Sequence, residues 1–433
     1  MLTIALRLPL LDSPSPDQLR FIPDGALVIQ DCTIAAAGPW NEISPQAAWS
    51  DLTWQTAPGC FATPGLIDTH LHLPQLPAIA RPEASLLPWL QKHIFPLEKT
   101  FTGPAVESLI RKFFSALIQN GTSTAVIYLA VYEDSAHRAF EIAEEMGLRV
   151  VMGKVMMDRG SYGDLAGEHA ILRQSLEETE RLIQRWHNKG RSHYAVSPRF
   201  AISCSQDLMR QAAALADTYQ TYVQTHLSEN HQEIQAVTEL FPWAQHYVDV
   251  YDQCGLLHDR TLLGHAIHLS SAEVDILRER RTVITHCPSS NLFLRSGIMP
   301  LDRWRAQGLR LSLASDVAGG PELNLWQVAR TGLDAQQARA FYENDTVVPK
   351  PKEMFHLATR AGAEALGWGE RLGLLQTGHL ADFAIWHLAD LTYGCHAHPG
   401  ELDAETLTAL LIYRGGPQAL KTLWIDGQAL PAV

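Results

Sequence analysis

Two histidines separated by one residue stand at the end of an apolar run that has the composition of a buried strand. The run spans residues 61–73, and the pair is His70 and His72 in the stretch IDTHLHLPQ. Alternate residues of a strand point to the same side. Both imidazoles can therefore reach one metal ion, which predicts that this strand carries half of a metal site.

Polar residues that can bind metal or move protons end several other apolar runs. They are His226, His265, His286 and Asp316. In a barrel of parallel strands the C-terminal strand ends meet on one face, where barrel enzymes carry out their chemistry. A set of three imidazoles and one carboxylate would leave a position for water on Zn²⁺ or Fe²⁺. Its members would be His70, His72, His226 and Asp316. Such a water has its pKa lowered towards about 7 and is a nucleophile at neutral pH.

Proton transfer is the expected task of a further group of residues. Glu229 follows His226 by three residues, and beside a strand-end histidine we favour a proton shuttle over a solvated loop residue. Asp316 ends the run LSLAS, where a buried carboxylate is costly without a metal or proton partner. His265 can bond the metal-bound water. Lys154 is expected either to extend its charged end to solvent or to be paired, rather than to bridge two ions, which favours a single ion.

Several classes of function are disfavoured by the sequence. The formal charge of −13 argues against a nucleic-acid backbone as partner. His231 and Glu233 form an HxE pattern, but no PCxxC accompanies it, so the second class of zinc deaminase does not fit. No phosphate-binding or dinucleotide glycine motif is present. The six scattered cysteines indicate no disulfide framework.

No membrane association or export is expected. No apolar run approaches the roughly 20 residues that span a bilayer. The stretch MLTIALRLPLLDSP lacks a basic leader and a small-residue cleavage site, so it does not predict a signal peptide. We expect a cytoplasmic protein that acts on a small molecule.

Short β-branched runs alternate with amphipathic segments through the middle of the chain. The predicted strands are 65–70, 123–129, 149–155, 193–198, 221–226, 261–266, 282–287 and 309–316. The predicted helices include 107–119, 136–146, 172–187, 206–219 and 272–280. This alternation is typical of parallel βα units, and eight of them predict an α/β fold, a closed (β/α)₈ (TIM) barrel.

The two ends of the chain have a different pattern, with short strands and turns. Neither end is large enough for a good β core, but together they could form one small β-sandwich. We therefore predict a composite domain from residues 1–63 and 370–433, with the barrel at 64–369 inserted between its halves.

The motifs named so far, with their neighbours, resemble the amidohydrolase superfamily in its mononuclear deaminase and chlorohydrolase branch. The stretches that carry the resemblance are PGLIDTHLH (64–72), THLSEN (225–230), GHAIHLS (264–270), HCPSSN (286–291) and SDVAGG (315–320). ADFAIW (381–386) is similar to the segment by which such chains return to their small β domain. The likeness extends from about residue 60 to the end of the sequence.

Within that branch the chain resembles the guanine deaminase family. The stretches HLPQ (72–75), LLPWLQKHIFPLE (86–98) and SPRFAISCS (197–205) carry this narrower likeness, with THLSENHQEI (225–234). The resemblance implies one zinc ion per subunit, with Fe²⁺ as the alternative, on His70, His72, His226 and Asp316. It implies a general acid/base at Glu229, a water-orienting His265, and a purine held by Gln75, Arg199 and Phe200. Trp89 would close over the site or pack in the core, and a homodimer is implied.

The implied reaction is hydrolytic removal of the amino group at C2 of guanine, with Asp316 taking a proton from the water and Glu229 protonating a ring nitrogen. Arg199 suits a carbonyl oxygen, Gln75 offers both a donor and an acceptor, and Phe200 can stack on the ring. Two alternatives remain open. One is a deaminase of 8-oxoguanine, a pterin, a triazine or an adenosine derivative, and the other is a barrel that serves only as a scaffold.

Overall fold

The computed structural model describes residues 3–160 and 168–430, and its centre is a barrel of parallel strands. The strands run in the order β16-β15-β14-β13-β12-β10-β9-β8, and the short β11 (Val155–Met156) pairs with β12. Their bounds are β8 (Leu66–His72), β9 (Thr122–Tyr128), β10 (Arg149–Gly153), β12 (Ser192–Pro198), β13 (Tyr222–Leu227), β14 (Thr261–His265), β15 (Val283–His286) and β16 (Arg310–Leu313). All eight predicted strands are confirmed.

The barrel closes where the first strand meets the chain that follows the last. Thr69 Oγ1 donates to the Leu313 carbonyl at 3.0 Å. Beyond the end of β16, the amide of Asp316 donates to the carbonyl of His70 at 2.8 Å, and the amide of His72 donates to that of Val317 at 2.8 Å. This seam joins the segments that carry three of the predicted metal ligands.

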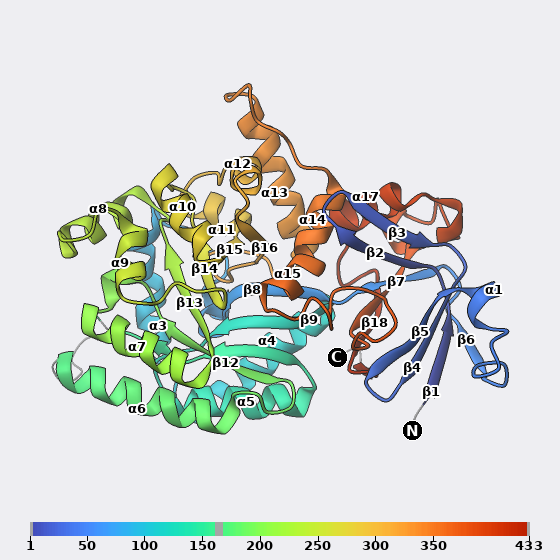
Figure 1. The fold of residues 1–433 in the computed structure, drawn as a ribbon, viewed down its shortest axis with the longest axis horizontal. Helices are drawn as coiled ribbons and strands as arrows, with labels where there is room; N and C mark the ends of the chain where they lie inside the picture. The colour runs from blue at the N-terminus through green and yellow to red at the C-terminus, as the bar shows by residue number, and fades with distance from the viewer. Residues whose placement is uncertain (1–2, 161–167, 431–433) are drawn as a thin grey trace.

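Helices cover the outside of the barrel (Figure 1). Their bounds are α4 (Val106–Gln119), α5 (Glu133–Met146), α6 (Glu168–Trp186), α7 (Gln206–Tyr219), α8 (His231–Leu240), α9 (Tyr247–Gln253), α10 (Ser271–Glu279), α11 (Pro288–Phe293), α12 (Leu301–Ala306), α13 (Leu325–Ala340), α14 (Pro351–Ala358) and α15 (Arg360–Ala365). The five predicted helices are present. Local sequence sets their ends: Ser270 and Glu273 form a capping box at the start of α10, and Gly147 ends α5 at φ 77°.

A short helical segment lies between β8 and α4. It consists of the 3₁₀ helix η1 (Leu73–Ala78), α2 (Leu86–Trp89), the π-helical η2 (Leu90–Ile94) and α3 (Phe95–Lys99). A further 3₁₀ turn, η3 (Ala201–Ser203), follows β12. Leu86, Trp89 and Leu90 of this segment are buried, so it packs against the barrel rather than extending into solvent.

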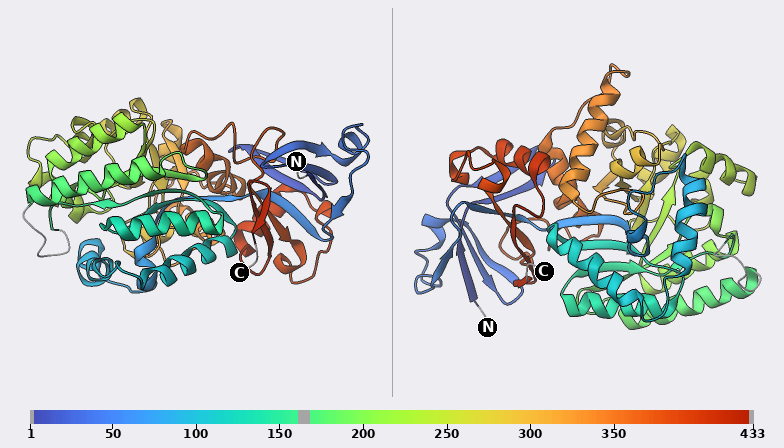
Figure 2. Two further views of the ribbon diagram at one scale, coloured as in Figure 1. Left: turned by 90° about the horizontal axis from the view of Figure 1, so that it is seen from below. Right: turned by 180° about the vertical axis from the view of Figure 1, so that it is seen from behind.

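Two smaller sheets form a second body beside the barrel (Figure 2). One sheet has the order β5-β4-β1-β6, and the other has the order β19-β18-β17-β7-β2-β3. Their bounds are β1 (Thr3–Arg7), β2 (Leu10–Ser15), β3 (Gln18–Ile22), β4 (Gly25–Gln30), β5 (Thr33–Pro39), β6 (Trp54–Thr56), β7 (Cys60–Pro64), β17 (Phe383–His387), β18 (Leu420–Ile425) and β19 (Gln428–Leu430). The second sheet combines strands from both ends of the chain.

The terminal sheets share a core of their own. Leu8, Leu27 and Ile29 from the first half pack with Phe383 and Ile385 from the second. The remaining short elements are α1 (Trp40–Ile43), α16 (Leu388–Leu391), η4 (Pro399–Glu401) and α17 (Ala404–Arg414). The prediction of strands and turns alone for 370–433 missed α17, which packs on α13 and α14. The domain limits at 63/64 and 369/370 remain a prediction.

Candidate active site

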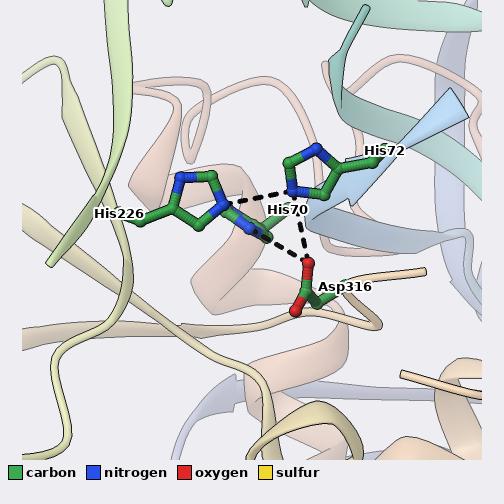
Figure 3. A group of neighbouring side chains, drawn as sticks. All are labelled: His70, His72, His226 and Asp316. Atoms are coloured by element: carbon green, nitrogen blue, oxygen red, sulfur yellow. Dashed lines mark hydrogen bonds and ion pairs between the residues drawn. The ribbon is translucent and has the colours of Figure 1, made fainter. Parts of the chain in front are cut away.

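Four side chains from three strand ends converge at the C-terminal face of the barrel (Figure 3). They are His70, His72, His226 and Asp316, and the ligand atom of each lies within 4.8 Å of the others. The Nε2 atoms of His70 and His72 lie 3.3 and 3.4 Å from Asp316 Oδ1. His72 Nε2 and His226 Nε2 are 3.1 Å apart.

The tautomer of His226 fits metal binding. Its Nδ1 lies 2.7 Å from the carbonyl oxygen of Arg199, which can only accept, so Nδ1 carries the proton. Nε2 then presents a lone pair to His72 and Asp316. His70 Nε2 is buried and makes no hydrogen bond of good geometry. Imidazole nitrogens that face one another without protons between them form a site for a cation.

The protonation states also fit metal binding. Burial lowers the pKa of His72 to about 4, that of His226 well below its usual value and that of His70 below it, so all three rings are neutral at pH 7. Burial alone would raise the pKa of Asp316, but contacts with His70 and His72 hold it well below the ordinary range. Three neutral imidazoles and one carboxylate are the donor set that zinc or ferrous iron takes.

A glycine makes room for this group. A Cβ atom on Gly264 would lie 2.6 Å from Cε1 of His70, closer than real contacts. The GHA stretch at the end of β14 therefore needs its glycine because the His70 ring packs against the backbone there. Asp68 accepts from the amides of Ser315 at 3.1 Å and His70 at 3.3 Å. Asp68 thus ties together two chain segments that carry members of the four-residue group.

Glu229 and His265 lie next to the four-residue group. Glu229 Oε2 is 3.4 Å from His265 Nε2, and Asp316 Oδ2 is 3.6 Å from the same nitrogen. Burial, with the negative charge of Asp316, raises the pKa of Glu229 to about 8. A carboxyl group with that pKa carries a proton at pH 7 and can donate it.

The predicted substrate residues line the same pocket. Gln75, Trp89, Arg199 and Phe200 surround it together with His72, His226, Glu229, His265 and Asp316. The Phe200 ring lies 6.5 Å from that of His226. Trp89 is 3% exposed and donates Nε1 to the Arg81 carbonyl at 3.0 Å, so it is both a wall of the pocket and part of the core.

Two candidates from the strand ends lie outside this group. His286 is fully buried with neither ring nitrogen hydrogen-bonded, and it is not among the four converging residues or the pocket lining. Lys154 is paired as expected, with its Nζ 3.0 Å from Glu178 Oε2.

The sequence did not indicate the residues that support the site from behind. Ser296 donates to Glu229 Oε1 at 2.8 Å, and Asn291 Oδ1 lies 2.8 Å from His265 Nδ1. Glu233 Oε2 accepts from the amides of Glu229 and Asn230. Glu98, on α3, contacts both Gln75 and Arg199. None of these supporting roles was predicted, although Glu98, Asn291 and Glu233 lie inside the stretches LLPWLQKHIFPLE, HCPSSN and THLSENHQEI.

The fold and this site define a hydrolase of the barrel type with a candidate metal site, and comparison with known proteins gives the family. The amidohydrolase family matches residues 61–430, so the chain belongs to that family. It is 34% identical to the probable guanine deaminase of Deinococcus radiodurans over 95% of this chain and 94% of that protein. It is also 34% identical to the guanine deaminase of Escherichia coli K12, over 87% of this chain and 84% of that protein.

Structural comparison agrees. The crystal structure of guanine deaminase from C. acetobutylicum with bound guanine in its active site superposes with a TM-score of 0.92 at 25% identity. The match covers 99% of this chain and 100% of the other. Among the described residues no helix is long and apolar enough to cross a membrane.

Proposed function

We propose that this chain is a guanine deaminase, a hydrolase of cyclic amidines that converts guanine and water into xanthine and ammonia. The observation that carries the proposal is the meeting, in one pocket, of a metal-binding group, a protonated glutamate and residues suited to a purine edge. The curated relatives, which match most of the chain and bear the name guanine deaminase, support it.

The purine would be held by the residues opposite the metal-binding group. Arg199 offers only donors, which suits the carbonyl oxygen of guanine. Gln75 offers one donor and one acceptor for the rest of that edge, and Phe200 stacks on the ring. Leu86, Trp89 and Leu90 add apolar side chains to the lining of the same pocket, which suits the faces of a purine ring.

We assign a single Zn²⁺ to His70, His72, His226 and Asp316, with Fe²⁺ as the alternative. Zinc there would polarise a bound water and lower its pKa towards about 7. The paired state of Lys154 supports one ion rather than two.

The proton steps fall to three residues of the chain. Asp316 accepts a proton from the attacking water, since its Oδ2 faces the pocket beside His265. His265 orients that water through Nε2. Glu229 donates its proton to a ring nitrogen as oxygen adds to C2. The amino group at C2 then takes the proton held by Asp316 and leaves as ammonia, while Glu229 recovers a proton from the C2 hydroxyl as the carbonyl forms. Glu229 and His265 are 3.4 Å apart, which keeps both groups next to the reacting atoms.

The test is ammonia release by metal-loaded protein from guanine, 8-oxoguanine, isoxanthopterin, adenine and cytosine. We expect the highest kcat/KM with guanine. Turnover of another heterocycle without turnover of guanine would refute the substrate assignment and leave the family intact. Protein that binds neither zinc nor iron, and gains no activity when they are added, would indicate a scaffold.

We further propose a homodimer in the cytoplasm. Helix α13 projects from the barrel (Figure 1). The side chains of Phe341, Tyr342 and Val347, in the segment that follows this helix, are 84%, 89% and 69% exposed. Such exposed apolar groups are typical of contact surfaces. All six cysteines are free, which suits a reducing compartment. Sedimentation of the protein and of a Phe341→Ser/Tyr342→Ser variant tests the assembly: the variant is expected to be monomeric, with Tyr393→Ser as the control.

A further inference from the structure

A buried carboxylate lies behind the residues that face the purine. Glu98 on α3 is 1% exposed and does not line the pocket. Its Oε1 accepts from Gln75 Nε2 at 2.8 Å, and its Oε2 accepts from Arg199 Nη1 at 2.5 Å. One side chain therefore holds two residues that lie 124 positions apart in the sequence, in the turns after β8 and β12.

This contact determines which way the Gln75 amide points. An ionised carboxylate can only accept hydrogen bonds, so the Gln75 group that faces it must be the NH₂. Gln75 Oε1 is then turned to the other side, where the amide of Ala318 approaches it at 3.4 Å. With a neutral partner in place of Glu98, the amide could adopt either orientation.

The same carboxylate fixes the guanidinium of Arg199. Arg199 is 2% exposed, and its charge is balanced by Glu98 at the back. The ring of Phe95, 5.2 Å from Arg199 Cζ, packs against it. A guanidinium held between a carboxylate and an aromatic ring keeps its planar donor fork in one direction.

We propose that Glu98 is a positioning residue that selects the edge of the purine. By fixing the amide of Gln75 and the guanidinium of Arg199, it makes the pocket complementary to a six-position carbonyl and not to a six-position amino group. The inference rests on the proposed guanine deaminase function and deepens it. Glu98 acts through its two partners, and the donors of Arg199 favour an acceptor on the substrate.

The discriminating pair of substrates is guanine and 2,6-diaminopurine. Both carry the amino group at C2 that would leave. They differ at C6, where guanine has a carbonyl and 2,6-diaminopurine has an amino group, and at N1, which carries a hydrogen only in guanine. The measurement is kcat/KM for each with wild-type protein and with Glu98→Gln. We expect wild type to prefer guanine and Glu98→Gln to lower the guanine to 2,6-diaminopurine ratio roughly 10- to 100-fold, the loss expected for a misdirected hydrogen bond to a charged group. The change should fall mainly on KM.

The matched control is Glu273→Gln, another buried glutamate of the chain. Glu273 caps α10, where it accepts from Ser270, and it lines no part of the pocket. That variant should lose stability without changing the substrate ratio. If Glu98→Gln lowers kcat/KM for both purines equally, Glu98 has only a structural role and the proposal is wrong.

Two further outcomes of the experiment also test the proposal. If Glu98→Gln yields no folded protein, Glu98→Asp replaces it, because it keeps the charge and withdraws the carboxylate by one methylene. A substrate ratio that Glu98→Asp leaves unchanged would also overturn the proposal. Wild-type protein that turns over neither purine refutes the proposed function itself, whereas wild-type turnover with an insensitive ratio refutes only the role of Glu98.

Discussion

The two ends of the barrel differ in how completely their charged and polar groups are paired. At the C-terminal end, buried imidazoles and carboxylates converge with incomplete hydrogen bonding, as for His70 Nε2. At the N-terminal end the charges are paired. Arg149, the first residue of β10, bonds Asp382 at 3.0 Å and Asp426 at 2.5 Å. The barrel thus has groups that can react at one end and, on β10 at the other end, an arginine whose ion pairs hold the fold together.

Cavity size does not mark the site. A pocket of about 700 Å³ lies near the N-terminal end of β16, between α12, α14 and the loop at 345–349. It is far roomier than the one at the C-terminal face, yet its charged groups are engaged with one another, as where Arg303 pairs with Asp345. The convergence of several buried groups that are short of hydrogen-bond partners is the better sign of chemistry here, because leaving them unpaired costs stability unless a ligand completes them.

Asp316→Asn is expected to have the largest effect of the variants. It should impair the candidate site at the C-terminal end of the barrel strands without affecting the N-terminal end. It removes the negative charge that faces His70 and His72 while keeping the shape of the side chain. Metal content should fall, and kcat should drop by at least the roughly 10⁴-fold at the top of the range for positioned acid–base groups. Elemental analysis and an ammonia assay measure both. Full metal content with full activity would contradict the assignment.

Glu229→Gln is expected to come next. It removes the titratable proton but no metal ligand, so kcat should fall about 10²- to 10⁴-fold with metal content unchanged. Glu107→Gln, which alters an exposed pair with Arg111, is the control and should leave kcat intact. An active Glu229→Gln protein would show that another group supplies the proton.

Arg149→Met tests the N-terminal end of the barrel. It should lower the free energy of unfolding and leave kcat unchanged. It leaves Asp382 buried without its cation and disturbs the join between barrel and terminal sheets. Breaking a buried pair costs about 3–5 kcal/mol, which denaturant unfolding would measure. Arg278→Met, in an exposed pair with Asp275, should cost less than about 1 kcal/mol. A large fall in kcat of folded Arg149→Met protein would contradict the division between the two ends.

The smallest expected effect is an acid-dependent loss of stability at the N-terminal end. Burial would raise the pKa of Asp426, but Arg149 and Arg191 hold it below its ordinary value. Its contribution is therefore fully present above the ordinary Asp pKa of about 3.9 and is lost as pH falls through the lower, folded value. Unfolding measured across that range should show a slope that Asp426→Asn reduces. An equal dependence of stability on pH in Asp426→Asn would show that another group causes the loss of stability in acid.

The sequence predicts much of the fold and the metal-binding group because both depend on local pattern. Strand periodicity set the eight βα units, and alternation along β8 placed His70 and His72 on one side. Since parallel strands share a C-terminal face, His226, His265 and Asp316 could be expected nearby. The separation of His286 from that group could not be predicted, because it depends on which way one strand end is turned.

The supporting residues could not be predicted because their roles exist only in three dimensions. Glu98 follows Lys92 and His93 in a mixed polar stretch, and only the packing of α3 brings it to Gln75 and Arg199. Helix α17 was missed because the residues around it have strand and turn patterns and its apolar side chains show no single stripe. The positive φ angles of His265 (69°) and Asp316 (49°) also have no glycine signal.

The seam between β8 and the end of β16 also governs when the site can exist. His70 and Asp316 are bonded backbone to backbone across 246 positions of the sequence, so the four-residue candidate metal site is not complete until the first and last strands meet. Closing so long a loop is the kind of step that slows folding, and its entropy must be offset by contacts made afterwards. An ion held by both segments would stabilise this contact after it forms, so metal uptake would report that the barrel has closed.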